Sequence, residues 1–323
     1  MIIDGKAIRD EIKDALAVKV GSIPPEDRPT LFIVMAGANA VTKNFVAIKK
    51  RFAEALGIPV EEKIFDDAEL PATASLVRAV EEIVARGKKG GIVVQIPLPP
   101  GIDTQTVLNA VPPQYDIDVL GDESLRLFRE GQLAIFPPVV GAIREILERN
   151  SIFLHGKKVA VLGQGRLVGV PVAAWFRKME ADVAVFDSTH PPKPEELQQL
   201  QQMQLPTGQP VQAAEPKPED KDKIHVLILV DDSDSRTMSK LELKDKLTAI
   251  IQSIGKPSFS TPDMVRDGAI VLDAGTSEAG GKIVGDASPE AAKKCALFTP
   301  VPGGIGPVTI AILLQNLLTL ATL

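Results

Sequence analysis

Residues 157–176 read KKVAVLGQGRLVGVPVAAWF, and this stretch decides the fold of the second half of the chain. An apolar strand runs into Gly163, Gly165 and Gly169, and an amphipathic helix follows. Glycines permit a tight turn and the close approach of a pyrophosphate, whose charge the free N–H groups of the helix N-terminus attract. The stretch predicts a dinucleotide-binding unit, although its third glycine falls one position later than in G-x-G-x-x-G.

The next apolar run, ADVAVFD (181–187), supports this interpretation. It ends in Asp187, followed by Ser188, roughly 20 residues after the glycines, where an acidic side chain can hold a ribose hydroxyl. The alternative is a structural strand, turn and helix in another kind of α/β domain.

Length and composition narrow the function classes. A chain of 323 residues is long enough for about two domains. A net charge of -6 argues against a nucleic-acid partner, and Cys295, the single cysteine, excludes an intramolecular disulfide and lacks partners for a metal site. No uncharged run reaches the roughly 18 residues of a membrane helix. We therefore expect a soluble, cytoplasmic protein without metal or membrane partners that binds a small molecule.

Apolar runs and helical periodicity alternate along the first half of the chain. Strands are expected at 30–37, 60–65 and 90–99, and helices at 7–20, from a cap at Asn39 to Gly57, and at 73–86. This alternation favours a parallel sheet covered on both faces.

A connection containing proline and aspartate, 112–138, leads to a linking helix at 140–150. Residues 191–223 are rich in Pro, Gln, Lys and Glu and predict a mobile insertion, with a partner-docking arm as the alternative. Beyond it, strands or helices are expected at 224–230, 240–246, 247–255, 269–275 and 307–320.

Four motifs, read together, carry a resemblance to a known family. They are NFVAIKK (44–50), VVQIPLPPGID (93–103), YDIDVLG (115–121) and TPVPGGIGPVTIAILLQN (299–316). The predicted dinucleotide-binding strand lies between the third and the fourth of these motifs. In this order the motifs resemble the bifunctional methylenetetrahydrofolate dehydrogenase/methenyltetrahydrofolate cyclohydrolase family, and the resemblance extends over nearly the whole chain.

The resemblance implies an α/β fold of two domains. Residues 1–138 with the C-terminal helix 307–323 would form an αβα folate-binding catalytic domain, and residues 139–306 a Rossmann-like dinucleotide-binding domain. The implied enzyme oxidises methylenetetrahydrofolate to methenyltetrahydrofolate with NADP or NAD and hydrolyses the product to formyltetrahydrofolate. It would be a homodimer that works in one-carbon metabolism and purine biosynthesis, in a cleft with folate on one side and dinucleotide on the other.

In that family a Y-x-x-x-K pair carries the folate chemistry, and the matching positions are Phe45 and Lys49. Four residues apart, they share one helix face. A partly desolvated lysine can exchange a proton near neutral pH, so the resemblance gives Lys49 the task of helping water attack the methenyl bridge. The alternative for Lys49 is a solvated residue at the edge of an amphipathic helix.

Gln95 and Asp118 complete the implied catalytic set. Gln95 ends a buried strand, where its amide could orient Lys49 and the folate ring. Asp118 matches the pterin-holding aspartate of the family's K-D-V-D-G motif, since a carboxylate can accept two hydrogen bonds from an amino-pyrimidine edge. Alternatively, the Gln95 amide forms its hydrogen bonds with neighbouring backbone groups, and Asp116 and Asp118 are ordinary turn residues.

Two further segments match the family. The turn Pro302, Gly303 and Gly304 is similar to its loop between the folate and nicotinamide positions, with a structural turn before the last helix as the alternative. The segment from Asp273 to Thr276 resembles D-V-G-I, whose backbone lies along the nicotinamide, although it could also be a buried strand end.

The chain also departs from the family pattern. Phe45 has no hydroxyl, Gln164 and Gly165 replace the usual Arg or Ala and Ser, and YDIDVLG lacks the glycine after the aspartate. Asp187 would favour NAD, because a carboxylate repels a ribose phosphate. The later Ser235 and Arg236 resemble the family's S-R-T and could bind the phosphate of NADP. We expect NADP to be the cofactor.

Two other functions fit parts of the sequence. One is a dehydrogenase for another small substrate that shares the nucleotide-binding domain alone. The other is a degenerate, non-catalytic relative that binds folate or nucleotide.

Overall fold

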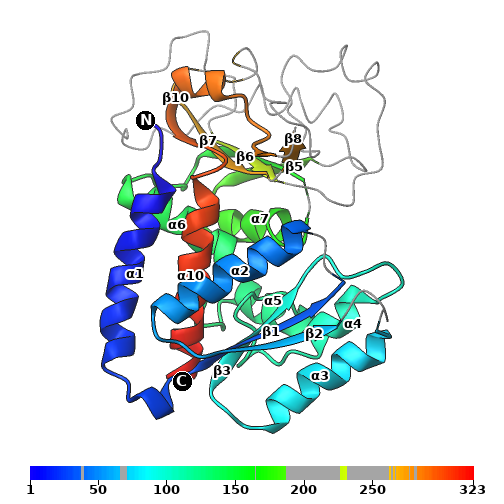
Figure 1. Ribbon diagram of the computed structural model, residues 1–323. Helices are drawn as coiled ribbons and strands as arrows, with labels where there is room; N and C mark the ends of the chain where they lie inside the picture. The colour runs from blue at the N-terminus through cyan, green and yellow to red at the C-terminus, as the bar shows by residue number, and fades with distance from the viewer. Residues whose placement is uncertain are drawn as a thin grey trace. The chain divides into compact units, whose positions relative to one another are not determined.

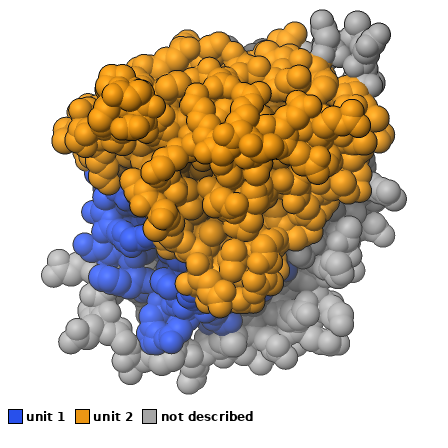
Figure 2. All heavy atoms as spheres, turned by 90° about the horizontal axis from the view of Figure 1, so that it is seen from below, with its two compact units in different colours: residues 1–6, 142–308 blue, residues 7–141, 309–323 orange. Residues whose placement is uncertain are grey.

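The computed structural model describes residues 1–37, 40–65, 71–163, 165–186, 226–230, 262, 265, 267–275, 277–279 and 282–323. This part of the chain divides into two compact units, coloured separately in Figure 2. Unit 1 contains residues 1–6 and 142–308, and unit 2 contains residues 7–141 and 309–323. Both are built from parallel strands and helices, so the expected two-domain α/β class is confirmed.

Unit 2 is built on a three-stranded parallel sheet with the order β2-β1-β3. The strands are β1 (Thr30–Ala36), β2 (Val60–Phe65) and β3 (Gly90–Gln95), labelled in Figure 1. Every residue of β1 and β3 is buried, as their uninterrupted apolar sequences predict for parallel strands covered on both faces. All three expected strands of the first half are present.

Among the described residues, several helical segments accompany this sheet, and the α-helices are labelled in Figure 1. They are α1 (Gly5–Gly21), the short 3-10 turn Pro25–Asp27, α2 (Ala40–Ala55), α3 (Thr73–Ala85), α4 (Thr104–Asn109), α5 (Asp122–Glu130) and α10 (Ile305–Ala321). Helix α2 ends before Gly57, whose positive φ of 73° suits a glycine after a helix. Helix α10 starts before the expected Pro307, because proline is tolerated in a first helical turn.

The two faces of the unit 2 sheet are covered differently. On one face Phe32 and Val34 of β1 and Ile92 and Val94 of β3 pack against helices α3 and α4. On the other face Gly91 leaves room for neighbouring side chains, since a Cβ there would lie 2.8 Å from Leu317 Cδ1 and also clash with Ile117. Helix α10 and the segment around Ile117 therefore lie directly against the backbone of β3.

The connection expected over 112–138 contains a helix that was not predicted from the sequence. Residues 122–130 form helix α5, with Leu125 and Phe128 buried and Gly131 in the left-handed conformation after its last residue. The single short apolar stripe in DESLRLFRE, between proline-containing flanks, is a weak signal, and tertiary packing stabilises the helix.

Unit 1 contains a five-stranded parallel sheet with the order β10-β7-β6-β4-β5. Its strands are β4 (Lys158–Leu162), β5 (Asp182–Phe186), β6 (Val226–Val230), β7 (Ala269–Ala274) and β10 (Cys295–Thr299). Among the described residues, the other elements of this unit are α6 (Pro138–Arg149), which begins in unit 2, α7 (Gly169–Lys178), the antiparallel pair β8 (Ser277–Ala279) and β9 (Lys282–Val284), and the 3-10 helix Pro289–Lys293.

The strand order of unit 1 reverses at β4. The chain passes from β4 outward to β5 and then returns to the other side of β4 to form β6. In open α/β sheets ligands bind outside the carboxyl ends of the strands at such a switch point. The glycine-rich turn after β4 is therefore at the position where a dinucleotide is expected.

Several expectations concern parts of the chain outside the described residues. They are the cap at Asn39, the insertion 191–223, and the elements at 240–246 and 247–255. Within the described residues, none of the helices combines the length and apolar character needed to cross a membrane.

Asn316 of α10 fastens two loops of unit 2. Its buried Nδ2 donates to the carbonyl oxygens of Ile117 at 2.9 Å and Phe136 at 2.8 Å. Replacing Asn316 by Ala should lower the free energy of unfolding by about 2–3 kcal/mol, because both bonds are lost inside the protein. Urea denaturation measures the change, and Gln315→Ala, at the exposed neighbouring position, is the control. Equal losses in the two variants would contradict this role.

Candidate active site

Lys49 and Gln95 meet at the carboxyl end of strand β3. Lys49 lies half-buried on helix α2, and its Nζ donates to Gln95 Oε1 at 2.9 Å. The Gln95 side chain is buried, and its Nε2 donates to the Ile96 carbonyl oxygen at 2.7 Å. These two bonds fix which way the amide points, so its oxygen faces the ammonium group.

Asp118 is the third charged or polar group of this cluster. Burial raises the pKa of its carboxyl group, and the positive charge of Lys49 acts in the opposite direction. The residue remains partly exposed. The structure thus brings the ammonium, the amide and the carboxylate together, although the three residues come from a helix, a strand end and a loop. We call Lys49, Gln95 and Asp118 the polar triad.

The loop that carries Asp118 is held against β3. The Ile92 N–H donates to the Tyr115 carbonyl oxygen at 2.7 Å, which makes an isolated parallel bridge between Ile92 and Asp116. The Asp116 carboxylate then accepts the N–H groups of Leu120 at 3.0 Å and Gly121 at 2.9 Å. This clamp closes the loop around Asp118, so Asp116 has a defined structural task that the motif alone did not assign.

Val119 adopts a conformation that usually requires glycine. Its φ is 57°, in the left-handed region, at the position where the family pattern has glycine. A β-branched residue is strained there. The Val119 side chain is fully buried, so its packing and the Asp116 clamp offset the strain. The loop therefore keeps a glycine-like backbone without the glycine.

Phe45 lies on helix α2, four residues before Lys49, and is half-buried. At this spacing its ring shares a helix face with the ammonium group. It offers a flat apolar surface beside the polar triad and contributes no hydroxyl.

The glycine turn of unit 1 joins β4 to helix α7. Gly163 follows β4 with a φ of 92°, and the Gly165 carbonyl accepts the N–H groups of Val168 at 3.2 Å and Val170 at 3.3 Å. Gly169 is the first residue of helix α7. Helix α7 therefore starts directly after a turn in which Gly163 adopts a φ that disfavours a side chain. In its first turn the Val170 N–H is bonded to Gly165, and Pro171 has no N–H.

Arg166 in this turn was not singled out by the glycine spacing. Arg166 follows Gly165 in the sequence and is half-buried. A guanidinium group suits phosphate recognition, so Arg166 is a further candidate phosphate-binding residue in this turn. The general enrichment of arginine in phosphate sites was the one signal that could have identified it.

The remaining predicted cofactor residues cannot be placed. Gln164, Asp187, Ser188, Ser235, Arg236 and Thr276 lie outside the described residues. Asp273, three residues before Thr276 in the sequence, is fully buried and accepts the N–H groups of Gly275 at 2.9 Å and Ala287 at 2.8 Å. Burial raises the pKa of Asp273 to about 7.

The turn Pro302–Gly304 joins β10 to α10 within unit 1. Gly303 has a φ of 110°, and the Gly304 N–H donates to the Pro300 carbonyl oxygen at 2.7 Å. Pro302 is exposed, whereas Gly304 is buried. Pro302 is therefore accessible, while the Gly304–Pro300 hydrogen bond holds the backbone of the turn in place.

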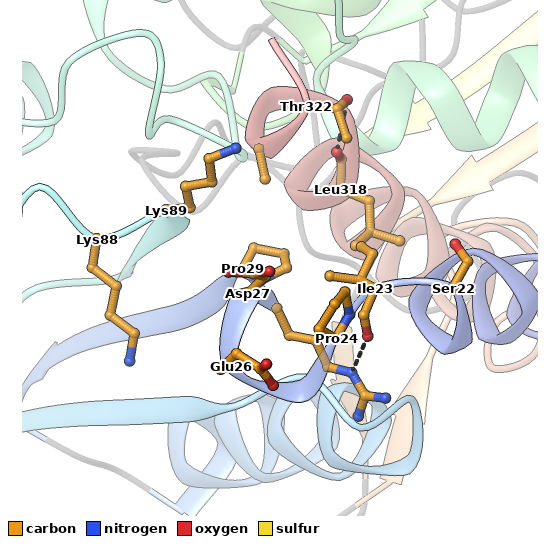
Figure 3. A pocket seen from close by; sticks show the side chains of 12 residues that line it. Ser22, Ile23, Pro24, Glu26, Asp27, Pro29, Lys88, Lys89, Leu318 and Thr322 are labelled. Atoms are coloured by element: carbon orange, nitrogen blue, oxygen red, sulfur yellow. Dashed lines mark hydrogen bonds between the residues drawn. The ribbon is translucent and has the colours of Figure 1, made fainter.

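A hollow of about 730 Å³ lies at the amino ends of β1 and β3, shown in Figure 3. It collects charges of both signs, including Asp27, Arg28 and Lys89. The polar triad lies instead at the carboxyl end of β3, where ligands of parallel α/β sheets bind. Among the described residues, no group of His, Cys, Asp and Glu side chains could hold a metal ion.

Two family models match the chain. "Tetrahydrofolate dehydrogenase/cyclohydrolase, catalytic domain" matches residues 3–118, and the "NAD(P)-binding domain" of the same family matches residues 225–323. The first range contains the polar triad, and the second contains the Pro302–Gly304 turn.

Similar proteins extend over nearly the whole chain. "Bifunctional protein FolD" of Campylobacter curvus is 31% identical over 326 residues, which cover 98% of this chain and 93% of the relative. The protein of that name from Cytophaga hutchinsonii is 30% identical over 333 residues, covering 100% and 99%.

A similar solved structure is the methylenetetrahydrofolate dehydrogenase-cyclohydrolase (FolD) of Trypanosoma brucei, complexed with NADP and an inhibitor. It has a TM-score of 0.78 and 26% identity, covering 100% of this chain and 97% of its own. The Campylobacter jejuni enzyme, at 24% identity and a TM-score of 0.77, shares the fold.

Asp116 makes the stability of the protein depend on pH. Burial raises the pKa of Asp116 from 3.8 to about 6, so the folded protein keeps a proton that the unfolded chain releases. Raising the pH from 4 to above 6 should therefore remove stability, on the order of 3 kcal/mol for this group.

The variant Asp116→Asn should lack this component, because an amide does not titrate. Denaturation by urea between pH 4 and pH 8 measures it as the difference between parent and variant. Asp14→Asn, at an exposed position of α1, is the control and should follow the parent. A parallel pH dependence in Asp116→Asn and the parent would refute the assignment.

Proposed function

Because the chain belongs to the tetrahydrofolate dehydrogenase/cyclohydrolase family, we propose that it acts on tetrahydrofolate derivatives as a bifunctional enzyme. It oxidises methylenetetrahydrofolate to methenyltetrahydrofolate with a nicotinamide dinucleotide, and it hydrolyses methenyltetrahydrofolate to formyltetrahydrofolate. The observation that carries the proposal is the 2.9 Å bond between Lys49 and Gln95, and the charge of the same ammonium group acts on the carboxyl group of Asp118, where it opposes the rise in pKa caused by burial. A dehydrogenase for another substrate would not require this triad.

We assign folate binding and dinucleotide binding to different domains, each built on one of the two sheets. Residues 1–138 with 307–323 form the folate-binding catalytic domain, and residues 139–306 form the dinucleotide-binding domain. The polar triad supports the first assignment, and the glycine turn between β4 and α7 supports the second.

In the hydrolysis step, Lys49 handles the proton. Water adds to the methenyl carbon and must lose a proton as the carbon–oxygen bond forms, and the bridge then opens to leave the formyl group on one nitrogen. A lysine amine at the bridge can accept or return that proton. Gln95 holds the Lys49 side chain in place by its fixed amide oxygen.

Asp118 binds the flat end of the substrate in this proposal. Its carboxylate can accept two N–H groups of an amino-pyrimidine edge, and partial burial strengthens such bonds. The positive charge of Lys49 favours the ionised acceptor form against the effect of burial. Phe45 stacks on the ring system, and without a hydroxyl it leaves the proton transfer to Lys49.

The turn after β4 fits a dinucleotide. The positive φ of Gly163 and the start of α7 at Gly169 provide a glycine turn that lets a pyrophosphate approach the backbone closely, and Arg166 adds a positive charge. When bound, NADP or NAD supplies the acceptor for the hydride of the methylene bridge. The chain's own contribution to that step is to bind and orient the two molecules.

Other attributes are proposed from the resemblance. They are a homodimer, a cytoplasmic location, and a place in one-carbon metabolism that supplies purine biosynthesis. The Pro302–Gly304 turn is proposed to contact the substrate, and Thr276 the nicotinamide.

Replacing Lys49 by Met should reduce the hydrolysis of methenyltetrahydrofolate by roughly 10²–10⁴-fold, the usual contribution of a positioned acid or base. Oxidation should persist, because the hydride goes to the dinucleotide. The loss of methenyl absorbance measures hydrolysis, and its appearance from methylenetetrahydrofolate measures oxidation.

Lys43→Met is the matched control, since Lys43 is exposed on the same helix. It should retain both rates. Hydrolysis by Lys49→Met at the parental rate would show that Lys49 is not the proton-transfer group. Binding of both ligands by the parent without turnover would contradict the proposed enzyme as a whole.

The catalytic efficiency, kcat/KM, should be at least about tenfold higher with NADP than with NAD, because charge-assisted bonds from Ser235 and Arg236 would recognise the extra phosphate. Arg236→Ala should remove the preference, whereas Asp187→Ala should not. Steady-state kinetics with both dinucleotides measures this. An equal or higher efficiency with NAD would mean that Asp187 sets the choice.

A further inference from the structure

The amino-terminal residues extend the edge of the unit 1 sheet. The Phe298 N–H donates to the Met1 carbonyl at 2.8 Å, and the Ile3 N–H donates to the Phe298 carbonyl at 2.9 Å. Ile2 and Phe298 form a parallel bridge, with Ile2 largely exposed and Ile3 buried. Residues 1–3 thus add a short strand to β10, immediately before the turn Pro302–Gly304.

Gly5 continues this contact into the turn itself. It is the first residue of α1, and its N–H, which has no partner within the helix, donates to the Gly303 carbonyl at 2.8 Å. Asp4 caps the same helix, since its Oδ1 accepts the Lys6 N–H at 3.0 Å. The start of α1 is therefore held both by its cap, Asp4, and by the turn, through Gly303.

There is no space for a side chain at residue 5. A Cβ on Gly5 would overlap the Gly304 carbonyl oxygen and lie 2.7 Å from the Gly303 carbonyl oxygen. Both are backbone atoms, so they cannot turn aside as a flexible side chain could. Gly304 is itself confined, since a Cβ on it would lie 2.6 Å from the Pro300 carbonyl oxygen.

From these contacts we propose that Gly5 is a positioning residue for the enzyme: it sets the place of the Pro302–Gly304 turn, and through that turn the binding of the folate substrate. The inference rests on the proposed function, in which this turn contacts the substrate. A methyl group at residue 5 must displace either the turn or the start of α1. Displacements of about 1 Å can reduce rates by about a hundredfold.

The test compares Gly5→Ala with Gly21→Ala in the full-length chain. Gly21 is the last residue of the same helix, and a Cβ there would meet nothing within 4 Å. We expect Gly5→Ala to lower kcat/KM for methylenetetrahydrofolate by roughly 10–100-fold, mainly through KM. Gly21→Ala should keep the parental values.

The kinetics are measured well below the Tm of each variant, with the folded fraction established by circular dichroism. A merely structural glycine would lower the Tm and leave kcat and KM of the folded protein unchanged, and that result would overturn the proposal. If Gly5→Ala does not fold, the variant Asp4→Ala provides the test, because it removes the cap at the start of α1 without adding a side-chain atom at residue 5. It should raise KM several-fold, and a parental KM would refute the inference. An inactive parent would instead refute the proposed function.

Discussion

The bare backbone of Gly91 is the constraint on which unit 2 depends. Because no side chain rises from β3 at this point, Ile117 and Leu317 pack directly on the strand. Ile117 precedes Asp118, and Leu317 follows Asn316, whose amide binds the Ile117 and Phe136 carbonyl groups. One glycine therefore lets a loop and the C-terminal helix approach the same strand whose end carries Gln95. The position of Asp118 follows from this close packing.

The polar groups of the site depend on that apolar framework. Half-buried or buried ionisable groups are unfavourable unless partners compensate them. Lys49 has the Gln95 oxygen and the nearby charge of Asp118, and Asp116 has the N–H groups of the loop that it closes. The raised pKa of Asp116 shows that the compensation is incomplete. At neutral pH the buried Asp116 carboxylate therefore destabilises unit 2, while its hydrogen bonds fix the loop beside the proposed catalytic lysine.

The departures from the family pattern have different structural consequences. Val119 replaces glycine and yet keeps a left-handed backbone, because its side chain is buried and the loop is clamped. The irregular spacing of Gly163, Gly165 and Gly169 still leads from β4 into α7. Phe45, in contrast, removes a chemical group that no neighbouring backbone change can restore. Backbone substitutions were accommodated by packing, whereas the lost hydroxyl alters what the site can do.

The sequence alone predicted many of the strands and long helices, since apolar periodicity is local and strong in segments such as 30–36 and 90–95, but it did not predict β8, β9 or β10. Motifs also identified Lys49, Gln95 and Asp118 as candidates. Helix α5 was missed, because its short stripe is stable only against a core. Tertiary structure decided that Lys49 reaches Gln95, that Asn316 holds Ile117, and that Gly5 meets Gly303. These contacts join residues far apart in the chain, and no local pattern encodes them because they arise from close packing of whole elements.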